Sequence, residues 1–234
     1  MTTQPSPSSR PGPRTPRSWR RTTAAVAAVL VVGVAVVLVG GQRSAESGGA
    51  PPMRVDDDRA AERLDELAAT APVPQREVIA AGDVSGGEYR GAMDEALECM
   101  ERDFAARGLD VDIRGPVASD DGFLLSYTYR LPATQSAAEA TEVERACRAA
   151  HVNDVEAAFQ LGRLVDDDYV EAVAARFSAC LDDAGVPGGA DDPRDAMIDA
   201  AQRTAGTRAH QRVADCAGSF PSVTNDPFGS GAAR

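Results

Sequence analysis

The pattern of hydrophobic and polar positions separates one long apolar run from a remainder with helical and strand periods. Residues 24–41 are 18 consecutive apolar positions. At about 1.5 Å per residue, a helix of this length covers about 27 Å, close to the hydrocarbon thickness of a bilayer. The run therefore predicts one transmembrane helix over residues 22–41.

The charges around this run predict its orientation. Residues 1–21 contain five arginines and no acidic residue, whereas the first charges after the run are the balanced Arg43 and Glu46. The positive-inside rule thus predicts a basic, disordered cytoplasmic tail over residues 1–21 and an exported remainder. A cleaved signal peptide is the alternative, although the run is longer than the apolar region of such peptides, which usually has about 7–15 residues.

The segment that follows has the composition of a linker. Residues 42–54 are small, polar and rich in proline and glycine. Three aspartates at residues 56–58 then precede a narrow apolar stripe, and carboxylates in that place cap a helix and complement its dipole. We predict a linker over residues 42–75 that contains one short juxtamembrane helix, ending before Pro72.

Residues 76–218 show the periods of a folded domain. Apolar side chains recur at helical spacing from Tyr89 to Gly108. Residues 109–115 and 123–131 alternate apolar and polar positions instead, with Phe123, Leu125, Tyr127 and Tyr129 on one face, which predicts a hairpin. Further helices are predicted over residues 134–159, with a bend near Asn153, from Asp166 to Gly185, and over residues 192–216.

These elements predict an α+β fold in which one N-terminal transmembrane helix precedes a mostly helical exported domain with a small antiparallel β-hairpin. Residues 219–234 are predicted to be a disordered tail. The chain has a formal charge of -12, and residues 1–41 contribute only positive charge to it. An acidic exported domain disfavours nucleic acid and anionic lipid headgroups as partners. The predicted lipid contact is therefore the one made by the transmembrane helix.

The four cysteines, Cys99, Cys147, Cys180 and Cys216, all follow the apolar run. An even number of cysteines on the oxidising side of a membrane favours disulfides over a metal site or a catalytic thiol. Three pairings are possible. We favour Cys99 with Cys147 and Cys180 with Cys216, because each bond then joins a cysteine on the flank of one helix to the next helix in the sequence.

The string from Tyr89 through ECM, Gly108, the SYTYRLP strand and ERACRAAHVNDVEAAFQ resembles a group of uncharacterised actinobacterial secreted or membrane-anchored proteins. That group pairs a cysteine before a glycine-ended helix with a second one after a tyrosine-rich strand. The resemblance therefore implies a bond between Cys99 and Cys147, in an actinobacterial cell envelope. The chain departs from the pattern at Phe159, where tryptophan is expected, and the resemblance implies no activity.

Asp110, Asp112 and Asp121 partly imitate an EF-hand calcium loop. The fifth position of that loop is Arg114, a cation where an oxygen ligand is needed, and the twelfth is aspartate where the loop uses a bidentate glutamate. The flanking residues also have strand patterns. We interpret this segment as a charged strand edge and turn, and we predict no metal ligand in the chain.

His151 and His210 are the candidates for general acid–base chemistry, but neither lies in a motif with a nucleophile. The GxSxG, HExxH, GxGxxG and P-loop patterns do not occur in the sequence. We therefore predict two histidines on helix surfaces, no catalytic residue and no cofactor. Tyr127 and Tyr129 are interpreted as core residues, with a groove beside Phe123 as the alternative.

The predicted function is a membrane-anchored, non-enzymatic binding or accessory module at the cell envelope, with an envelope protein or a small molecule as its partner. The lack of a catalytic motif and the disulfide scaffold favour it. The alternative is an envelope hydrolase with a site assembled from scattered Asp, Glu and His side chains. A pocket with an exposed carboxylate or histidine favours the hydrolase, whereas an apolar patch around the tyrosines favours the binding module.

Overall fold

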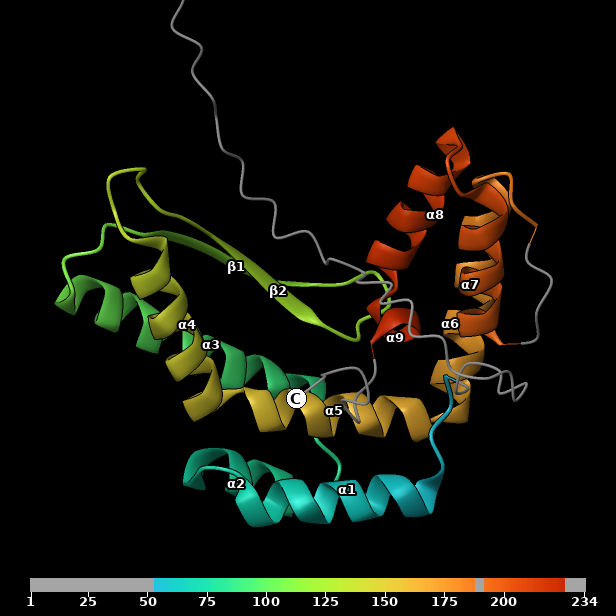
Figure 1. Ribbon diagram of the computed structural model, residues 1–234. Coiled ribbons are helices and arrows are strands. Elements are labelled where there is room, and N and C mark those ends of the chain that lie inside the picture. Colours follow the sequence, from blue (N-terminus) through green and yellow to red (C-terminus); the bar gives the residue numbers. More distant parts are fainter. Residues whose placement is uncertain (1–52, 188–191, 226–234) are drawn as a thin grey trace, which may run out of the picture. The chain divides into compact units, whose positions relative to one another are not determined.

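The computed structural model describes residues 53–187 and 192–225, which belong to one compact unit, Ala45–Arg234 (Figure 1). Within these residues the chain forms nine helices and one two-stranded antiparallel sheet. The elements are α1 Asp57–Thr70, α2 Val73–Ala80, α3 Gly86–Ala106, β1 Asp112–Ala118, β2 Leu125–Arg130, α4 Ala137–His151, α5 Asn153–Val165, α6 Asp167–Asp183, α7 Pro193–Thr204, α8 Arg208–Ser219 and α9 Pro221–Thr224.

The helices α1 and α2 are part of the folded domain, not of a linker. Both pack along α5 (Figure 1). Met53 and Leu67 are buried, and the backbone N–H of Val55 donates to the carbonyl oxygen of Leu164 at 2.9 Å. The domain therefore begins by Met53, earlier than the predicted boundary at residue 76.

Gln75 fixes α2 against the junction of α4 and α5. Its side-chain nitrogen donates to the carbonyl of Ala149 at 2.8 Å, and its Oε1 accepts from the backbone N–H groups of Asp154 at 2.7 Å and Val155 at 3.3 Å. The residue before α5, Val152, supplies no side-chain cap. Gln75 thus satisfies two backbone donors that the first turn of α5 leaves open.

The hairpin of β1 and β2 is antiparallel, as predicted, but β1 runs on to Ala118. Ile113 pairs with Tyr129, and the register shifts between Arg114 and Val117. The shift includes Gly115, whose φ of 133° and close approach to Tyr127, 2.8 Å from where a Cβ would stand, leave no room for a side chain. The local alternation of β1 could not show a strand that continues past this irregularity.

Two breaks in helical runs shape the rest of the domain. The end of α4 at His151 and the start of α5 at Asn153 confirm the predicted bend. The single helix predicted over residues 192–216 is instead two helices, α7 and α8, because Gly206 turns the chain between them with a φ of 76°. Residues 221–224 form α9 where a disordered tail was predicted.

The core is one continuous cluster of buried apolar side chains that extends from Met53 to Val223. Tyr89, Phe104 and Phe123 are among its largest fully buried members. At the C-terminal end, the guanidinium of Arg194 donates to the backbone carbonyls of Ser222, Val223 and Asn225. These contacts hold α9 against α7.

The predicted fold class, α+β with an N-terminal transmembrane helix, is wrong, although the predicted mostly helical domain with one small antiparallel hairpin is present. The described residues are mostly helical and contain strand only in the two-stranded hairpin. Among these same residues, no helix is long and apolar enough to cross a membrane. The segment for which the spanning helix was predicted, residues 22–41, lies outside the described residues, as do residues 1–21 and 226–234.

Candidate functional site

Two disulfides join helices in the domain. The first links Cys99 of α3 to Cys147 of α4, and the second links Cys180 of α6 to Cys216 of α8. This is the pairing favoured from the sequence. The second bond skips α7, however, because the predicted last helix is broken in two.

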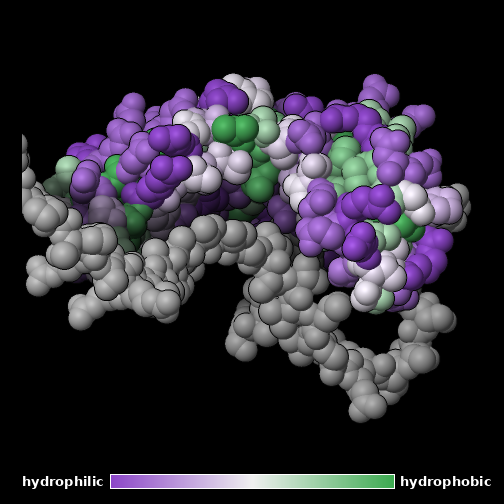
Figure 2. All heavy atoms as spheres, turned by 90° about the horizontal axis from the view of Figure 1, so that it is seen from above, coloured by the Kyte–Doolittle hydropathy of each residue, from purple (hydrophilic) through white to green (hydrophobic). Residues whose placement is uncertain are grey.

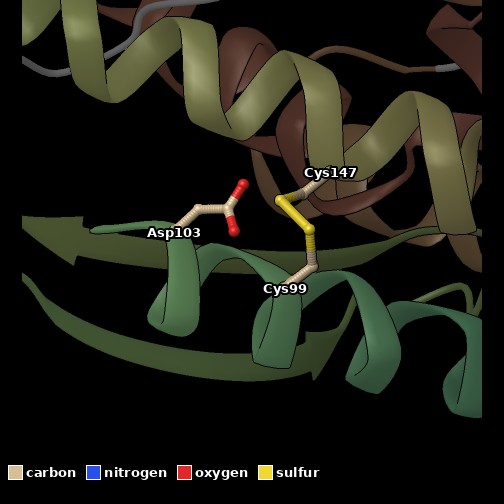
Figure 3. A group of neighbouring side chains, drawn as sticks. All are labelled: Cys99, Asp103 and Cys147. Atoms are coloured by element: carbon tan, nitrogen blue, oxygen red, sulfur yellow. A yellow bond between two sulfur atoms is a disulfide. The ribbon is translucent and has the colours of Figure 1, made fainter. Parts of the chain in front are cut away.

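A carboxylate lies beside the first disulfide (Figure 3). Asp103 is one helical turn after Cys99 on α3 and its side chain points toward the sulfurs of Cys99 and Cys147. The two Sγ atoms and a carboxylate oxygen lie within 4.8 Å of one another. If the disulfide is reduced, two sulfurs and one oxygen at this spacing are a potential metal-ligand set, which the sequence did not reveal because Cys147 comes from a different helix.

A separate pocket of about 440 Å³ opens between α2 and α3, and we call it the α2–α3 pocket. It combines acidic side chains, one histidine and small or apolar side chains. Its lining consists of Pro74, Glu77, Val78, Ala81, Glu88, Gly91, Ala92, Glu95, His151 and Val155. This volume is within the range of about 300–1,000 Å³ that is usual for ligand pockets.

Helical spacing on α3 builds one wall of the α2–α3 pocket. Gly91 and Ala92 each lie three or four residues from both Glu88 and Glu95, so the four residues share one face of the helix. Gly91 faces open space, since a Cβ at this position would meet no atom within 4 Å. The opposite wall is α2, which begins after Pro72 with a second proline in its first turn. The rigid turn before α2 sets where Glu77 lies.

The charges around this pocket are mostly negative. Glu88 Oε2 accepts hydrogen bonds from the Ser85 hydroxyl at 2.7 Å and from the Ser85 backbone N–H at 2.8 Å, in a capping box at the start of α3. The hydrogen bond from the hydroxyl is the larger cause, and together with the one from the backbone N–H it holds the pKa of Glu88 below its ordinary value. Glu88 therefore keeps its negative charge to lower pH than an ordinary glutamate.

His151 lies in the α2–α3 pocket, at the end of α4. Its Nδ1 is 3.4 Å from Glu95 Oε2, and no hydrogen-bond partner for this nitrogen exists among the described residues. The second candidate histidine, His210, is exposed near the start of α8 and does not line the pocket. The structure therefore brings one of the two predicted candidates to a cavity, together with glutamates that the sequence did not single out.

The aspartates of the EF-hand-like segment do not converge. The carboxylate of Asp112 is paired with Arg114 at 3.0 Å on the exposed strand β1. Asp121 is buried and accepts hydrogen bonds from Ser119 Oγ, from the backbone N–H of Phe123, and from both the N–H and the hydroxyl of Ser222. Asp121 thus connects the hairpin turn to α9, and these hydrogen bonds occupy both of its carboxylate oxygens.

The aspartates at residues 56–58 and 166–168 act at helix starts. Asp56 accepts from two backbone N–H groups at the start of α1, and Asp166 does the same at the start of α6. Asp192 caps α7 with Pro193 behind it. These are the capping roles that the sequence indicated, and they account for the clustering of acidic residues there.

Tyr127 and Tyr129 are half-buried, and their hydroxyls both donate to the Glu144 carboxylate of α4, at 2.5 and 3.0 Å. Burial, with Glu144 nearby, raises the pKa of both tyrosines. Figure 2 shows a mostly hydrophilic face in which hydrophobic side chains form small, separate patches. Tyr127 and Tyr129 pack against the edge of the core as partly buried side chains, not within it as interpreted from the sequence.

The sequence contains part of the pattern that forms the α2–α3 pocket. The small residues Gly91 and Ala92 between two glutamates on one helical face indicate a shallow acidic surface. Glu77 and His151 join it only through the packing of α2 against α4 and α5, which no local pattern shows. Comparison with models of protein families, with curated proteins and with solved structures finds no match for this chain.

Proposed function

We propose that this chain is a non-enzymatic binding module that works outside the cytoplasm and takes an organic cation in the α2–α3 pocket. The ligand is an ammonium or guanidinium group on a short apolar stem. One observation carries the proposal: three glutamates, Glu77, Glu88 and Glu95, line a cavity whose other lining residues, apart from His151, are small or apolar.

The charge of the pocket favours a cation. Glu77, Glu88 and Glu95 line it, and although the chain has 24 basic residues, all arginine, no arginine is among the lining residues. Carboxylates without a compensating cation repel one another, and a bound cation relieves that repulsion. His151 is the one lining side chain that could carry a positive charge, and it lies on the Glu95 side.

The apolar part of the lining favours a stem of a few methylene groups. Val78 of α2, Ala92 of α3 and Val155 of α5 contribute this surface. Burying a methylene group contributes about 0.8 kcal/mol. A bare inorganic cation would gain nothing from these side chains, so the mixed lining favours an organic amine.

Gly91 supports the view that the space in the pocket is functional. Glycine in a helix interior costs about 0.5–1 kcal/mol relative to alanine. No neighbour would collide with a Cβ at position 91. Packing therefore gives no reason for glycine there, whereas an open ligand pocket does.

The disulfides support the proposed compartment. The cysteines of the described residues are all bonded in pairs. Disulfides persist in secreted and cell-surface proteins and are rare in the cytosol. The pairing thus supports a domain that works outside the cytoplasm, in a cell envelope.

A hydrolase is the second candidate function, and the contact of His151 with Glu95 favours it, because a carboxylate can orient a histidine that acts as a general base. Against it, the pocket lining includes no hydroxyl or thiol that could act as a nucleophile. The route that the contact between His151 and Glu95 favours is activation of a water molecule by His151. Loss of hydrolysis with intact cation binding in His151→Gln would identify this route.

The proposed function is tested by calorimetry on the purified full chain, with cadaverine as the probe and pentane-1,5-diol as its uncharged counterpart. We expect one cadaverine per chain and no heat with the diol. Glu95→Gln should weaken cadaverine binding about two- to fivefold, as expected for a partly exposed ion pair. The control Glu101→Gln, on the same helix but outside the pocket, should change nothing. Equal binding of the diol, or equal effects of the two variants, would overturn the proposal.

A further inference from the structure

We infer that the reduced form of Cys99 and Cys147, together with Asp103, is a binding site for Zn²⁺. The three donor atoms lie within 4.8 Å of one another, and Figure 3 shows the carboxylate of Asp103 directed toward the two sulfurs. Formation of the disulfide closes this site. The inference is independent of the α2–α3 pocket, which shares none of these residues.

The donor set matches the preferences of zinc. Zn²⁺ accepts cysteine sulfur at about 2.3 Å and carboxylate oxygen at about 2.0–2.2 Å, so ligands around a tetrahedral ion stand about 3.3–3.8 Å apart. Cys99 and Asp103 are spaced by one turn on α3, and Cys147 faces them from α4. Side-chain rotation is therefore enough to reach this spacing, and a water molecule completes the fourth position.

Charge explains why a dication is favoured in the reduced form. Once both thiol protons are lost, two thiolates beside a carboxylate place three negative charges at a site where Cys99 is 8% and Cys147 1% exposed. Arg102 offsets part of this charge, since its Nε lies 4.0 Å from Asp103 Oδ1, whereas Arg148 is paired with Glu156 at 3.1 Å and Arg107 with Glu142 at 3.6 Å. A bound Zn²⁺ offsets the charge that these arginines do not neutralise.

The chemistry balances with an external dithiol as the reductant. The dithiol gives two electrons to the bond between Cys99 and Cys147, which breaks into two thiols, while the dithiol closes its own disulfide. Zn²⁺ then displaces both thiol protons to solvent and binds the two thiolates and the Asp103 carboxylate. The same dithiol state exists in every newly made chain before the bond first forms.

The second disulfide provides an internal control. Among residues 53–187 and 192–225, no group of three potential metal ligands includes Cys180 or Cys216. If zinc binding merely reflected free thiols, both cysteine pairs would bind the ion alike. If Asp103 is a ligand, the pair Cys99 and Cys147 binds the ion more tightly than the pair Cys180 and Cys216.

The test uses the full chain reduced with a phosphine and titrated with Co²⁺, whose thiolate charge-transfer absorption reports the ligands, followed by displacement with Zn²⁺. Two variants isolate the pairs: Cys180→Ser with Cys216→Ser, and Cys99→Ser with Cys147→Ser. In the first variant, we expect one Co²⁺ per chain with two thiolates. Asp103→Asn should weaken it at least about tenfold, since loss of a residue that merely supports a ligand already costs about 10–100-fold.

The exposed Asp94, on the same helix, provides a matched control, and Asp94→Asn should leave Co²⁺ affinity unchanged. Equal affinity in the two cysteine variants would overturn the inference, including the case in which reduction unfolds the chain and exposes all thiols. Unchanged affinity in Asp103→Asn would overturn it as well.

Discussion

The hydroxyl of Tyr89 in α3 donates a hydrogen bond to Glu156 of α5, with 2.6 Å between the oxygens. The same hydroxyl accepts from the backbone N–H of Leu125 in β2 at 3.1 Å. Arg148 of α4 approaches Glu156 at 3.1 Å from the other side. Because Tyr89 is 1% exposed, one buried polar group joins the hairpin to three helices.

Replacing this hydroxyl should destabilise the domain. Tyr89→Phe leaves the buried N–H of Leu125 without its acceptor, and we expect the free energy of unfolding to fall by about 1–3 kcal/mol. Urea denaturation followed by circular dichroism measures the change. Tyr129→Phe is the control, because its half-buried hydroxyl bonds Glu144 nearer the surface and should contribute less than about 1 kcal/mol. An equal loss in both variants contradicts the special role of Tyr89.

The tyrosines also predict how stability depends on alkaline pH. Burial raises the pKa of Tyr89, Tyr127 and Tyr129, and raises the pKa of Tyr169 to about 12. The pKa of these tyrosines is higher in the folded state than the unfolded value of about 10. Their contribution to the free energy of unfolding is therefore fully present below pH 10 and is lost as the pH rises from about 10 towards 12. We expect tyrosinate absorbance to appear together with loss of helix. Titration of all four tyrosines near pH 10 with unchanged circular dichroism would disagree.

Replacing Asp121 should lower the free energy of unfolding more than replacing an exposed carboxylate. It accepts four hydrogen bonds, two of them from backbone N–H groups in Phe123 and Ser222. Asp121→Ala leaves these buried donors unsatisfied and should cost at least about 2 kcal/mol. The neighbouring, exposed Asp120 is the matched control, and Asp120→Ala should change the free energy of unfolding by less than about 0.5 kcal/mol. Thermal unfolding of the two variants side by side distinguishes them.

The sequence predicted the elements whose pattern is local. The alternation from Phe123 to Tyr129 indicated the buried face of β2, and the change of apolar stripe near Asn153 indicated the break between α4 and α5. The pairing of Cys99 with Cys147 could be favoured because helices that follow each other in the chain usually pack together. The same reasoning gave the pairing of Cys180 with Cys216, although α7 lies between α6 and α8 in the chain. Each of these inferences needed residues from one or two adjacent segments.

The features that the sequence did not predict depend on contacts between residues far apart in the chain. Leu67 looked like part of a weak stripe in a linker, yet it is buried because α5 lies beside it. Gln75 caps α5 from 79 positions away in the sequence, as judged by its bond to Asp154. The α2–α3 pocket exists because this contact brings α2 to the end of α4, where His151 lies. Periodicity along the chain carries no information about such contacts.

Gly91 is a position where a substitution should stabilise the domain. Gly91→Ala should raise the free energy of unfolding by about 0.5–1 kcal/mol, because alanine favours helix and nothing obstructs its Cβ. Gly115→Ala should do the opposite, since its φ is positive and a Cβ would collide with Tyr127. Denaturant titration of both variants checks the contrast. A destabilising Gly91→Ala would mean that packing, not an open pocket, explains this glycine.

The most direct measurement for the proposed function is the location of bound cadaverine by nuclear Overhauser contacts in the full chain. The α2–α3 pocket predicts contacts between the methylene protons of cadaverine and the methyl groups of Val78, Ala92 and Val155, with loss of these contacts in Gly91→Leu, which fills the cavity. Contacts to other parts of the domain, or none at cadaverine concentrations that saturate the calorimetric signal, would contradict a cation-binding role for this pocket.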